Sequence, residues 1–115
     1  MGHENLYFDC SGVTEALSIY YCMKEYGADH MLYGGDFNFG EDIGRIVSVG
    51  SNAVGLHPGY LDESKMPGCY KYQPFNNLIE GLFALAEAGR LLSFTKKDWN
   101  KVFYENGMKI IHNCR

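Results

Sequence analysis

The chain carries ADHMLYGGDF at residues 28–37, and this stretch decides the fold. A short apolar run leads to Gly34 and Gly35 and then to a single carboxylate, Asp36. In a parallel α/β sheet, this order places a carboxylate at the carboxyl end of a buried strand, where such folds keep their active sites. The two glycines remove side-chain bulk just before Asp36, so a substrate or metal can approach the backbone closely. Asp36 is therefore the first candidate for a functional residue.

The residues before this stretch predict a strand, a helix and a second strand. Residues 6–8 are strand formers, and apolar side chains at 13, 16, 17, 20 and 23 have the spacing of one helical face. Ser11 is the predicted N-cap of this helix, and Gly27 its predicted end. The second strand is expected at about residues 30–33. Such a unit implies parallel strands and a right-handed crossover.

The middle of the chain predicts a long irregular insertion. Residues 39–74 hold all three prolines and show no sustained period. A short strand or helical turn is expected at residues 46–49. The rest is expected to be an ordered loop, and loops of that length are usually functional or mobile.

Helical periodicity returns after Pro74. A first helix is expected to end at Gly89, and residues 95–98 have the form of a capping box with Asp98 in place of the usual Glu. The last helix has an inner stripe made up of Trp99, Val102, Phe103, Asn106 and Ile110. A buried amide must be hydrogen-bonded, so we expect Asn106 to bond to backbone groups near a strand end.

Composition limits the classes of protein that this chain fits. With 115 residues, 46% of them hydrophobic, it can form one packed module over residues 1–115. Ten basic against 14 acidic side chains give a net charge of −4, and the absence of a basic run argues against nucleic acid as a partner. No apolar stretch reaches the roughly 18 residues of a membrane span. No secretory signal is recognisable, which favours a cytoplasmic location.

The cysteines and the N-terminus add two expectations. Cys10, Cys22, Cys69 and Cys114 have no metal-site spacing, so we expect free, mostly buried thiols rather than a zinc site. Residues 4–8 also match the start of a protease-cleavage tag, but Asp9 stands where the tag has glutamine. We therefore interpret these residues as a native strand.

Three segments resemble a known family. Residues 6–12 (LYFDCSG) and 26–37 (YGADHMLYGGDF) resemble the last two strands of amidohydrolase-related metal-dependent hydrolases, in which a Gly-Ala-Asp…Gly-Ser-Asp segment leads out of the eighth barrel strand. Residues 99–111 resemble the closing helix, which commonly carries Glu-Asn-Ala. The resemblance covers most of the chain except roughly residues 40–72. It implies an α/β fold class: a partial TIM-barrel-like fragment with a β-α-β unit, a long irregular insertion and C-terminal helices.

The resemblance also implies a role for Asp36. In the family, an aspartate at this position touches the catalytic metal and handles the proton of the attacking water. A divalent metal, zinc being the expected ion, lowers the pKa of bound water towards ~7, and a nearby carboxylate can accept its proton. Asn38 and His57 are candidate contacts to a small-molecule substrate. The alternative for Asp36 is a purely structural role in a turn, which is common for Asp after glycine.

The chain also departs from the family pattern. It has no His-x-His pair and no ligands from middle strands; Gly35 replaces the usual Ser, and Gly107 the usual Ala. A barrel of this kind needs about 250 residues and eight strands. A catalytic zinc usually has three protein ligands, so Asp36 by itself cannot hold one.

Two functional hypotheses follow. The first is the C-terminal fragment of a metal-dependent hydrolase or decarboxylase, inactive without the missing strands, which a longer parent chain or a partner would supply. The second is a non-catalytic module derived from such a barrel. Its exposed strand edges and apolar faces would be covered by self-association. The sequence leaves open whether this chain is an enzyme by itself.

Overall fold

The computed structural model describes residues 5–36, 38–57 and 75–114. Helices predominate, with two small two-stranded sheets, which fits a mixed α/β class. The elements are β1 (Phe8–Asp9), α1 (Ala16–Tyr26), the 3-10 turn η1 (Ala28–His30), β2 (Met31–Leu32), β3 (Arg45–Val49), β4 (Asn52–Leu56), α2 (Asn77–Leu91), α3 (Lys96–Asn100), the π-helical turn η2 (Lys101–Glu105) and α4 (Asn106–Asn113). No helix within these ranges is long and apolar enough to cross a membrane.

The predicted strand–helix–strand unit is confirmed. β1 and β2 pair in parallel, with Phe8 opposite Met31 and Asp9 opposite Leu32, and α1 connects them. Gly27 ends α1 as predicted: its φ of 79° is one that residues with a side chain rarely adopt, and its N–H donates to the carbonyl of Met23.

The predicted start of this helix is wrong. α1 begins at Ala16 with Glu15 at the N-cap position, so Ser11 lies upstream of the cap; its N–H and hydroxyl donate to the carboxylate of Asp9. The later start also corrects the predicted apolar face. Ile19 and Met23 are the buried residues of α1, whereas Leu17 is 61% exposed.

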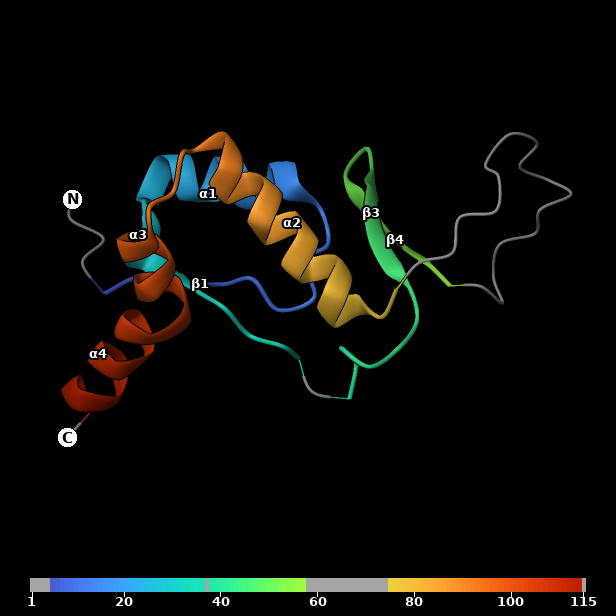
Figure 1. Cartoon of the computed structure of the whole chain (residues 1–115). Coiled ribbons are helices and arrows are strands. Elements are labelled where there is room, and N and C mark those ends of the chain that lie inside the picture. Colours follow the sequence, from blue (N-terminus) through green and yellow to red (C-terminus); the bar gives the residue numbers. More distant parts are fainter. Residues whose placement is uncertain (1–4, 37, 58–74, 115) are drawn as a thin grey trace, which may run out of the picture.

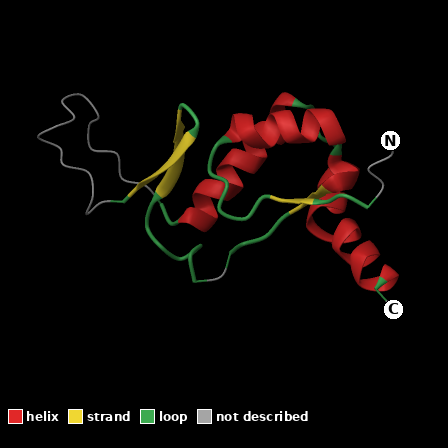
Figure 2. Ribbon diagram, turned by 180° about the vertical axis from the view of Figure 1, so that it is seen from behind, coloured by secondary structure: helices red, strands yellow, loops and turns green. Residues whose placement is uncertain are grey.

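The core lies where α1 and α2 pack together on one side of the β1–β2 pair (Figure 2). Ile19 and Met23 from α1 meet Leu85 and Ala88 from α2, and Val102 from the C-terminal helices completes the cluster. Burial of apolar side chains contributes roughly 25 cal/mol per Å² of area removed from water, so this cluster is the main source of stability.

Gly89 has a different function from the predicted one. α2 continues through Gly89 to Leu91, so Gly89 does not end the helix. A Cβ at this position would lie 2.3 Å from the indole ring of Trp99. Gly89 therefore allows Trp99 to pack directly against the backbone of α2.

The middle of the chain is more regular than predicted. Of the short strand or helical turn expected at residues 46–49, the structure has the strand, β3, which pairs with the unpredicted β4 in an antiparallel hairpin from Arg45 opposite Leu56 to Val49 opposite Asn52. The connecting Gly50-Ser51 has a positive φ at the glycine, as a tight two-residue hairpin turn requires. In Figure 1 the hairpin lies near the N-terminal end of α2. The rest of the predicted insertion, residues 58–74 with Cys69, lies outside the described residues.

The hydroxyl of Thr14 connects this hairpin to the segment before α1 by hydrogen bonds. Thr14 is 2% exposed, and its Oγ1 both donates to the carbonyl of Ile46 and accepts from the N–H of Ile46. Nearby, the Ser48 hydroxyl donates to the Glu15 carboxylate. A single buried side chain thus satisfies both backbone groups of one residue of β3.

The C-terminal helices begin as predicted and reach back to β2. Thr95 and Asp98 form the predicted capping box. The buried side chain of Asn106 donates to the carbonyls of Ala28 and Met31, at 2.7 and 2.8 Å. The prediction that Asn106 satisfies backbone groups at a strand end is therefore confirmed.

We expect Asn106→Ala to lower the free energy of unfolding by about 2–4 kcal/mol, because it leaves two carbonyls beside the core without their donor. Urea denaturation measures the change. Asn113→Ala, at an exposed position of the same helix, is the control and should change stability by less than about 0.5 kcal/mol. Equal effects of the two substitutions would contradict this account of Asn106.

Candidate functional site

Asp36 lies in the loop that follows β2, beyond the carboxyl end of the parallel strand pair. Its side chain is exposed, and its carbonyl accepts a hydrogen bond from the N–H of Gly40 at 2.6 Å. Its Oδ2 lies 3.6 Å from where a Cβ on Gly12 would be, so the carboxylate borders the loop that follows β1. Asp36 thus lies in the loop after β2, which ends at Leu32, rather than at the last residue of the strand.

Gly34 brings the ends of the two strands together. A Cβ on Gly34 would lie 2.0 Å from the Ser11 hydroxyl and 2.7 Å from the Asp9 carboxylate. Those two side chains are held by their own hydrogen bonds, at 2.8 Å between Ser11 Oγ and Asp9 Oδ1. Only glycine at position 34 leaves room for this pair beside β2.

The loop of Asp36 has an unusual backbone. Asp36 and Asn38 have φ angles of 49° and 76°, in the left-handed region. That conformation costs roughly 1–2 kcal/mol per residue with a side chain, and Asp and Asn tolerate it best. The backbone conformation is therefore an explanation for Asp36 and Asn38 at these positions, beside the candidate functional role.

The start of α2 holds this loop in place. Leu78 N–H donates to the carbonyl of Gly40, and Asn77 N–H donates to that of Asp42, both at 2.9 Å. The Asn77 side chain, 2% exposed, also donates to the carbonyl of Phe39 at 3.1 Å. Sequence reasoning missed Asn77; the signal was the Asn-Asn pair before an apolar helix, in which Asn76 is the N-cap.

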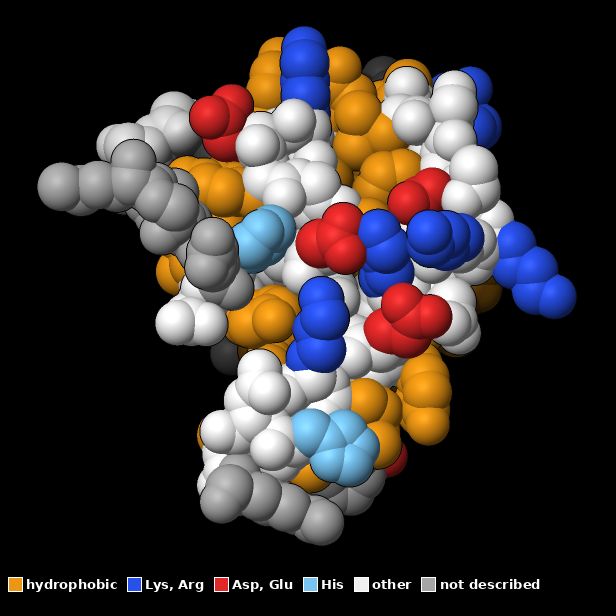
Figure 3. Space-filling view, turned by 90° about the vertical axis from the view of Figure 1, so that its left-hand side faces the viewer, with side chains coloured by type: hydrophobic (Ala, Val, Ile, Leu, Met, Phe, Trp, Pro, Cys, Tyr) orange, Lys and Arg blue, Asp and Glu red, His pale blue; other side chains and the backbone are white. Residues whose placement is uncertain are grey.

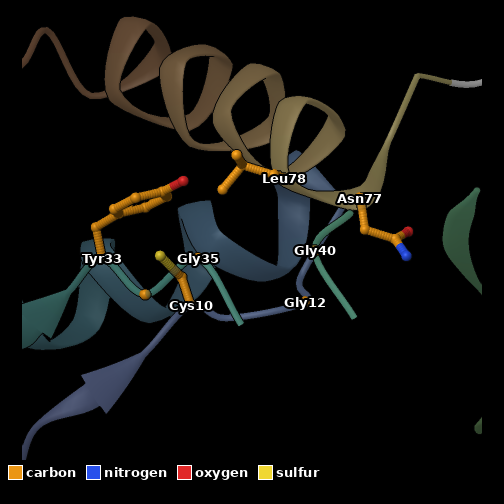
Figure 4. Close-up of a pocket in the computed structure, with 9 residues that line it drawn as sticks. Cys10, Gly12, Tyr33, Gly35, Gly40, Asn77 and Leu78 are labelled. Carbon is orange, nitrogen blue, oxygen red and sulfur yellow. The ribbon is translucent and has the colours of Figure 1, made fainter. Parts of the chain in front are cut away.

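Two hollows flank the loop. Figure 4 shows the smaller one, where Tyr33 and Leu78 lie above Cys10, and Asn77 and several glycines line the rest. Its volume is about 10 Å³, enough for one water molecule at most. The second is an open depression of about 230 Å³ lined by Gly35, Asp36, Gly40, Glu41 and Leu78. Asp36 thus faces a space that could hold part of a small molecule.

His57 lies elsewhere. Its Nδ1 donates to the carbonyl of Ile43 at 3.1 Å, and its ring packs so closely on Gly44 that a Cβ there would lie 2.7 Å from Nδ1. These contacts place His57 against the β3–β4 hairpin. The structure brings Asp36 and Asn38 into one loop and does not place His57 in it.

The part of the chain that the structure describes does not form a metal site by itself. Within the described ranges, no three His, Cys, Asp or Glu side chains are close enough to hold an ion. Asp36 contributes one carboxylate, whereas a catalytic zinc usually has three protein ligands. No chemical step through a metal can therefore be derived from this chain alone.

Charges near the strands are mixed in sign. Lys101 Nζ lies 2.7 Å from the Asp29 carboxylate, and this hydrogen bond raises the pKa of Lys101. On the face seen in Figure 3, basic and acidic side chains lie next to one another. This face therefore has no single sign of charge that would favour a charged ligand.

Comparisons with family profiles, with curated proteins and with solved structures gave no match to this chain. The amidohydrolase resemblance therefore rests on the residues quoted above. The function has to be argued from the geometry of this chain.

We expect Gly34→Ala to destabilise the fold by about 1–3 kcal/mol, because the added methyl group overlaps the Ser11 hydroxyl. Thermal or urea unfolding measures it. The matched control is Gly107→Ala in α4, where a Cβ meets nothing within 4 Å. That substitution should instead stabilise the chain by up to about 1 kcal/mol through helix propensity. A neutral Gly34→Ala would contradict the packing described here.

Because Cys10 is buried, we expect the fold to lose stability at alkaline pH. The thiol is buried, and burial raises its pKa from 9.0 to about 11. The folded chain therefore holds this proton more tightly than the unfolded chain does. The stability that this difference in pKa contributes to the fold is fully present below pH 9 and is lost as the pH rises through about 11.

We expect the free energy of unfolding to fall by at most about 1.4 kcal/mol per pH unit in this range because of Cys10. Denaturant unfolding across the range measures it. Cys10→Ala should remove this part of the decline, while Cys114→Ala, at an exposed thiol, should leave it unchanged. The same slope in both variants would show that Cys10 is not its source.

Proposed function

We propose that this chain is the C-terminal portion of an amidohydrolase-related, metal-dependent hydrolase or decarboxylase that acts on a small molecule. One observation carries the proposal: Asp36 lies just past the carboxyl end of the second of two parallel strands joined by a helix. In barrels and open α/β sheets, catalytic groups are found at this edge. In this proposal β1 and β2 are the last two strands of a TIM-like barrel.

The C-terminal helix supports the same proposal. The family's closing helix commonly carries an asparagine at the position of Asn106, and here Asn106 bonds to the backbone at the start of β2. The segment that resembles the family therefore contains a residue that stabilises β2, the strand that precedes Asp36. Asn106 bonds to Ala28 and Met31 and not to the loop of Asp36, so its proposed role is in positioning β2.

Asp36 would act as a proton acceptor and as one ligand of a divalent metal, with zinc the expected ion. An exposed carboxylate bordering an open depression can take a proton from water and pass it to a leaving group. The other ligands would come from strands outside this chain. The chain alone is therefore expected to be inactive, and Asn38, in the same loop, is the proposed contact to substrate.

A second candidate is a non-catalytic module that self-associates. Its supporting observation is an apolar groove of about 350 Å³ lined by Leu82, Phe83, Leu85, Ala86, Trp99 and Phe103. Phe83 and Phe103 are 58% and 50% exposed. Exposed apolar surface of this kind often marks a contact with another protein segment.

The reading frame of the gene provides the first test. We expect it to extend upstream of this chain and to encode a His-x-His pair. The full-length product should retain a divalent metal, measured by mass spectrometry of the purified protein. A frame that lacks such ligands, or a full-length product without metal, would favour the non-catalytic module.

In the full-length product, Asp36→Asn should weaken metal binding by at least about 10-fold. Even the loss of a group that only hydrogen-bonds to a metal ligand usually lowers the metal affinity by that factor. Asp42→Asn is the matched control, because this exposed residue of the same loop bonds to Asn77 through its backbone. Competition titration with a chelator measures both affinities. Equal metal affinity in the two variants would exclude Asp36 from the site.

A further inference from the structure

The amide that bonds to β2 belongs to a chemically labile dipeptide. Asparagine occurs at eight positions of the sequence, and only Asn106 is followed by glycine. An asparagine amide is lost most readily before glycine, because glycine has no Cβ to hinder attack by its own backbone nitrogen. The residue on which the edge of β2 depends therefore has the most reactive amide in the chain.

The fold holds this amide in a conformation that cannot react. Asn106 is 1% exposed, and its Nδ2 donates to the carbonyls of Ala28 and Met31 at 2.7 and 2.8 Å. Its backbone is helical, with φ −64° and ψ −41°. The reaction passes through a planar five-membered ring, which cannot close at a helical ψ and which requires the side chain to leave both carbonyls. The amide can therefore react only in molecules in which the start of α4 has opened.

We propose that Asn106 is a deamidation site that the fold protects, and that its product no longer fits the fold. In an opened chain, the Gly107 nitrogen loses its proton and attacks Asn106 Cγ. The bond from Cγ to Nδ2 breaks, and the amide nitrogen leaves as ammonia. Water then opens the succinimide ring to aspartate or isoaspartate, so no oxidant, metal or second protein is required. This proposal does not depend on the hydrolase assignment.

The surroundings of the Asn106 side chain accept hydrogen bonds but do not donate them. Its two partners are carbonyl oxygens, and its own Oδ1 is buried without a donor in the part of the chain that the structure describes. An aspartate would lose both hydrogen bonds and place a buried negative charge against two carbonyl oxygens, which is strongly unfavourable. An isoaspartate would also insert a methylene group into the backbone where η2 meets α4. Either product removes the contact that covers the edge of β2.

The rate of deamidation should follow the population of opened molecules. Ring closure is far slower than the opening and closing of a helix, so the observed rate is the rate in the unfolded chain multiplied by the opened fraction. We expect Asn106 to react at least about 10-fold more slowly in native buffer than in guanidinium chloride at the same pH, the ratio for an opening free energy of roughly 1.4 kcal/mol. Peptide mass spectrometry measures both rates. Equal rates, or no reaction in the denaturant, would overturn the proposal.

A refolding experiment tests the fate of the product. The chain is kept in guanidinium chloride until part of Asn106 has reacted, then returned to native conditions and exposed briefly to a protease at an intermediate denaturant concentration, which removes unfolded chains. We expect the surviving chains to be depleted in reacted Asn106. Survivors with the same reacted fraction as the starting mixture would contradict the proposal.

Gly107→Ala is the matched control for both experiments. It keeps Asn106 and its contacts, and the added methyl group, which meets nothing within 4 Å in the folded chain, hinders ring closure. In the denaturant, where the fold no longer contributes, Asn106 should react at least about 10-fold more slowly in this variant, a difference of roughly 1.4 kcal/mol in the barrier. The yield of refolded chain should then stay near its starting value. An unchanged rate would show that the amide is not lost through the Gly107 nitrogen.

Asn106→Asp reproduces the aspartate product directly. We expect it to unfold at a lower urea concentration than Asn106→Ala, because alanine removes the two hydrogen bonds without adding a buried charge. Asn113→Asp adds the same charge at an exposed position of α4 and should unfold close to the midpoint of the original chain. An Asn106→Asp chain as stable as Asn106→Ala would exclude the proposed effect of the product.

Discussion

The contact of Asn106 and Val102 with β2 is the constraint on which the rest of the fold depends. In a regular α-helix, the N–H of Asn106 would bond to Val102. Here it bonds to Lys101, one residue further back, in a π-helical turn. The carbonyl of Val102 is thereby free to accept from Tyr33, while the Asn106 side chain bonds to Met31. The π-helical turn thus leaves a backbone carbonyl of the helix available to accept the hydrogen bond from the edge of β2.

Local chemistry made some parts of the fold predictable. The end of α1 at Gly27 requires a positive φ, and the capping box at Thr95 needs only residues three positions apart. Asn106 could be assigned because a polar amide within an apolar helical stripe must find a partner. The candidate Asp36 was chosen in the same way, from a glycine pair after a short apolar run, and its role stays a prediction. Each of these inferences uses only neighbouring residues.

The errors came from contacts between distant residues or from competing local partners. Ser11 was predicted to cap a helix, but that helix begins later, at Ala16, and Ser11 bonds to the Asp9 carboxylate instead. Gly89 was predicted to end a helix, but it lies within one because Trp99 packs against it. The hairpin turn Gly50-Ser51 was readable as a two-residue loop between apolar runs and was overlooked. The hydrogen bond from the Asn77 side chain to the Phe39 carbonyl joins two residues that no local sequence pattern connects.

The hydrogen bonds of Asn106 also bear on how the chain reaches its fold. They join residues separated by 75 and 78 positions, so the first sheet is completed only after residue 106 has been synthesised. Until then, the edge of β2 stays open and can pair with other nascent chains. Such non-local closure slows folding, because the entropy of a long loop is lost before the contact forms.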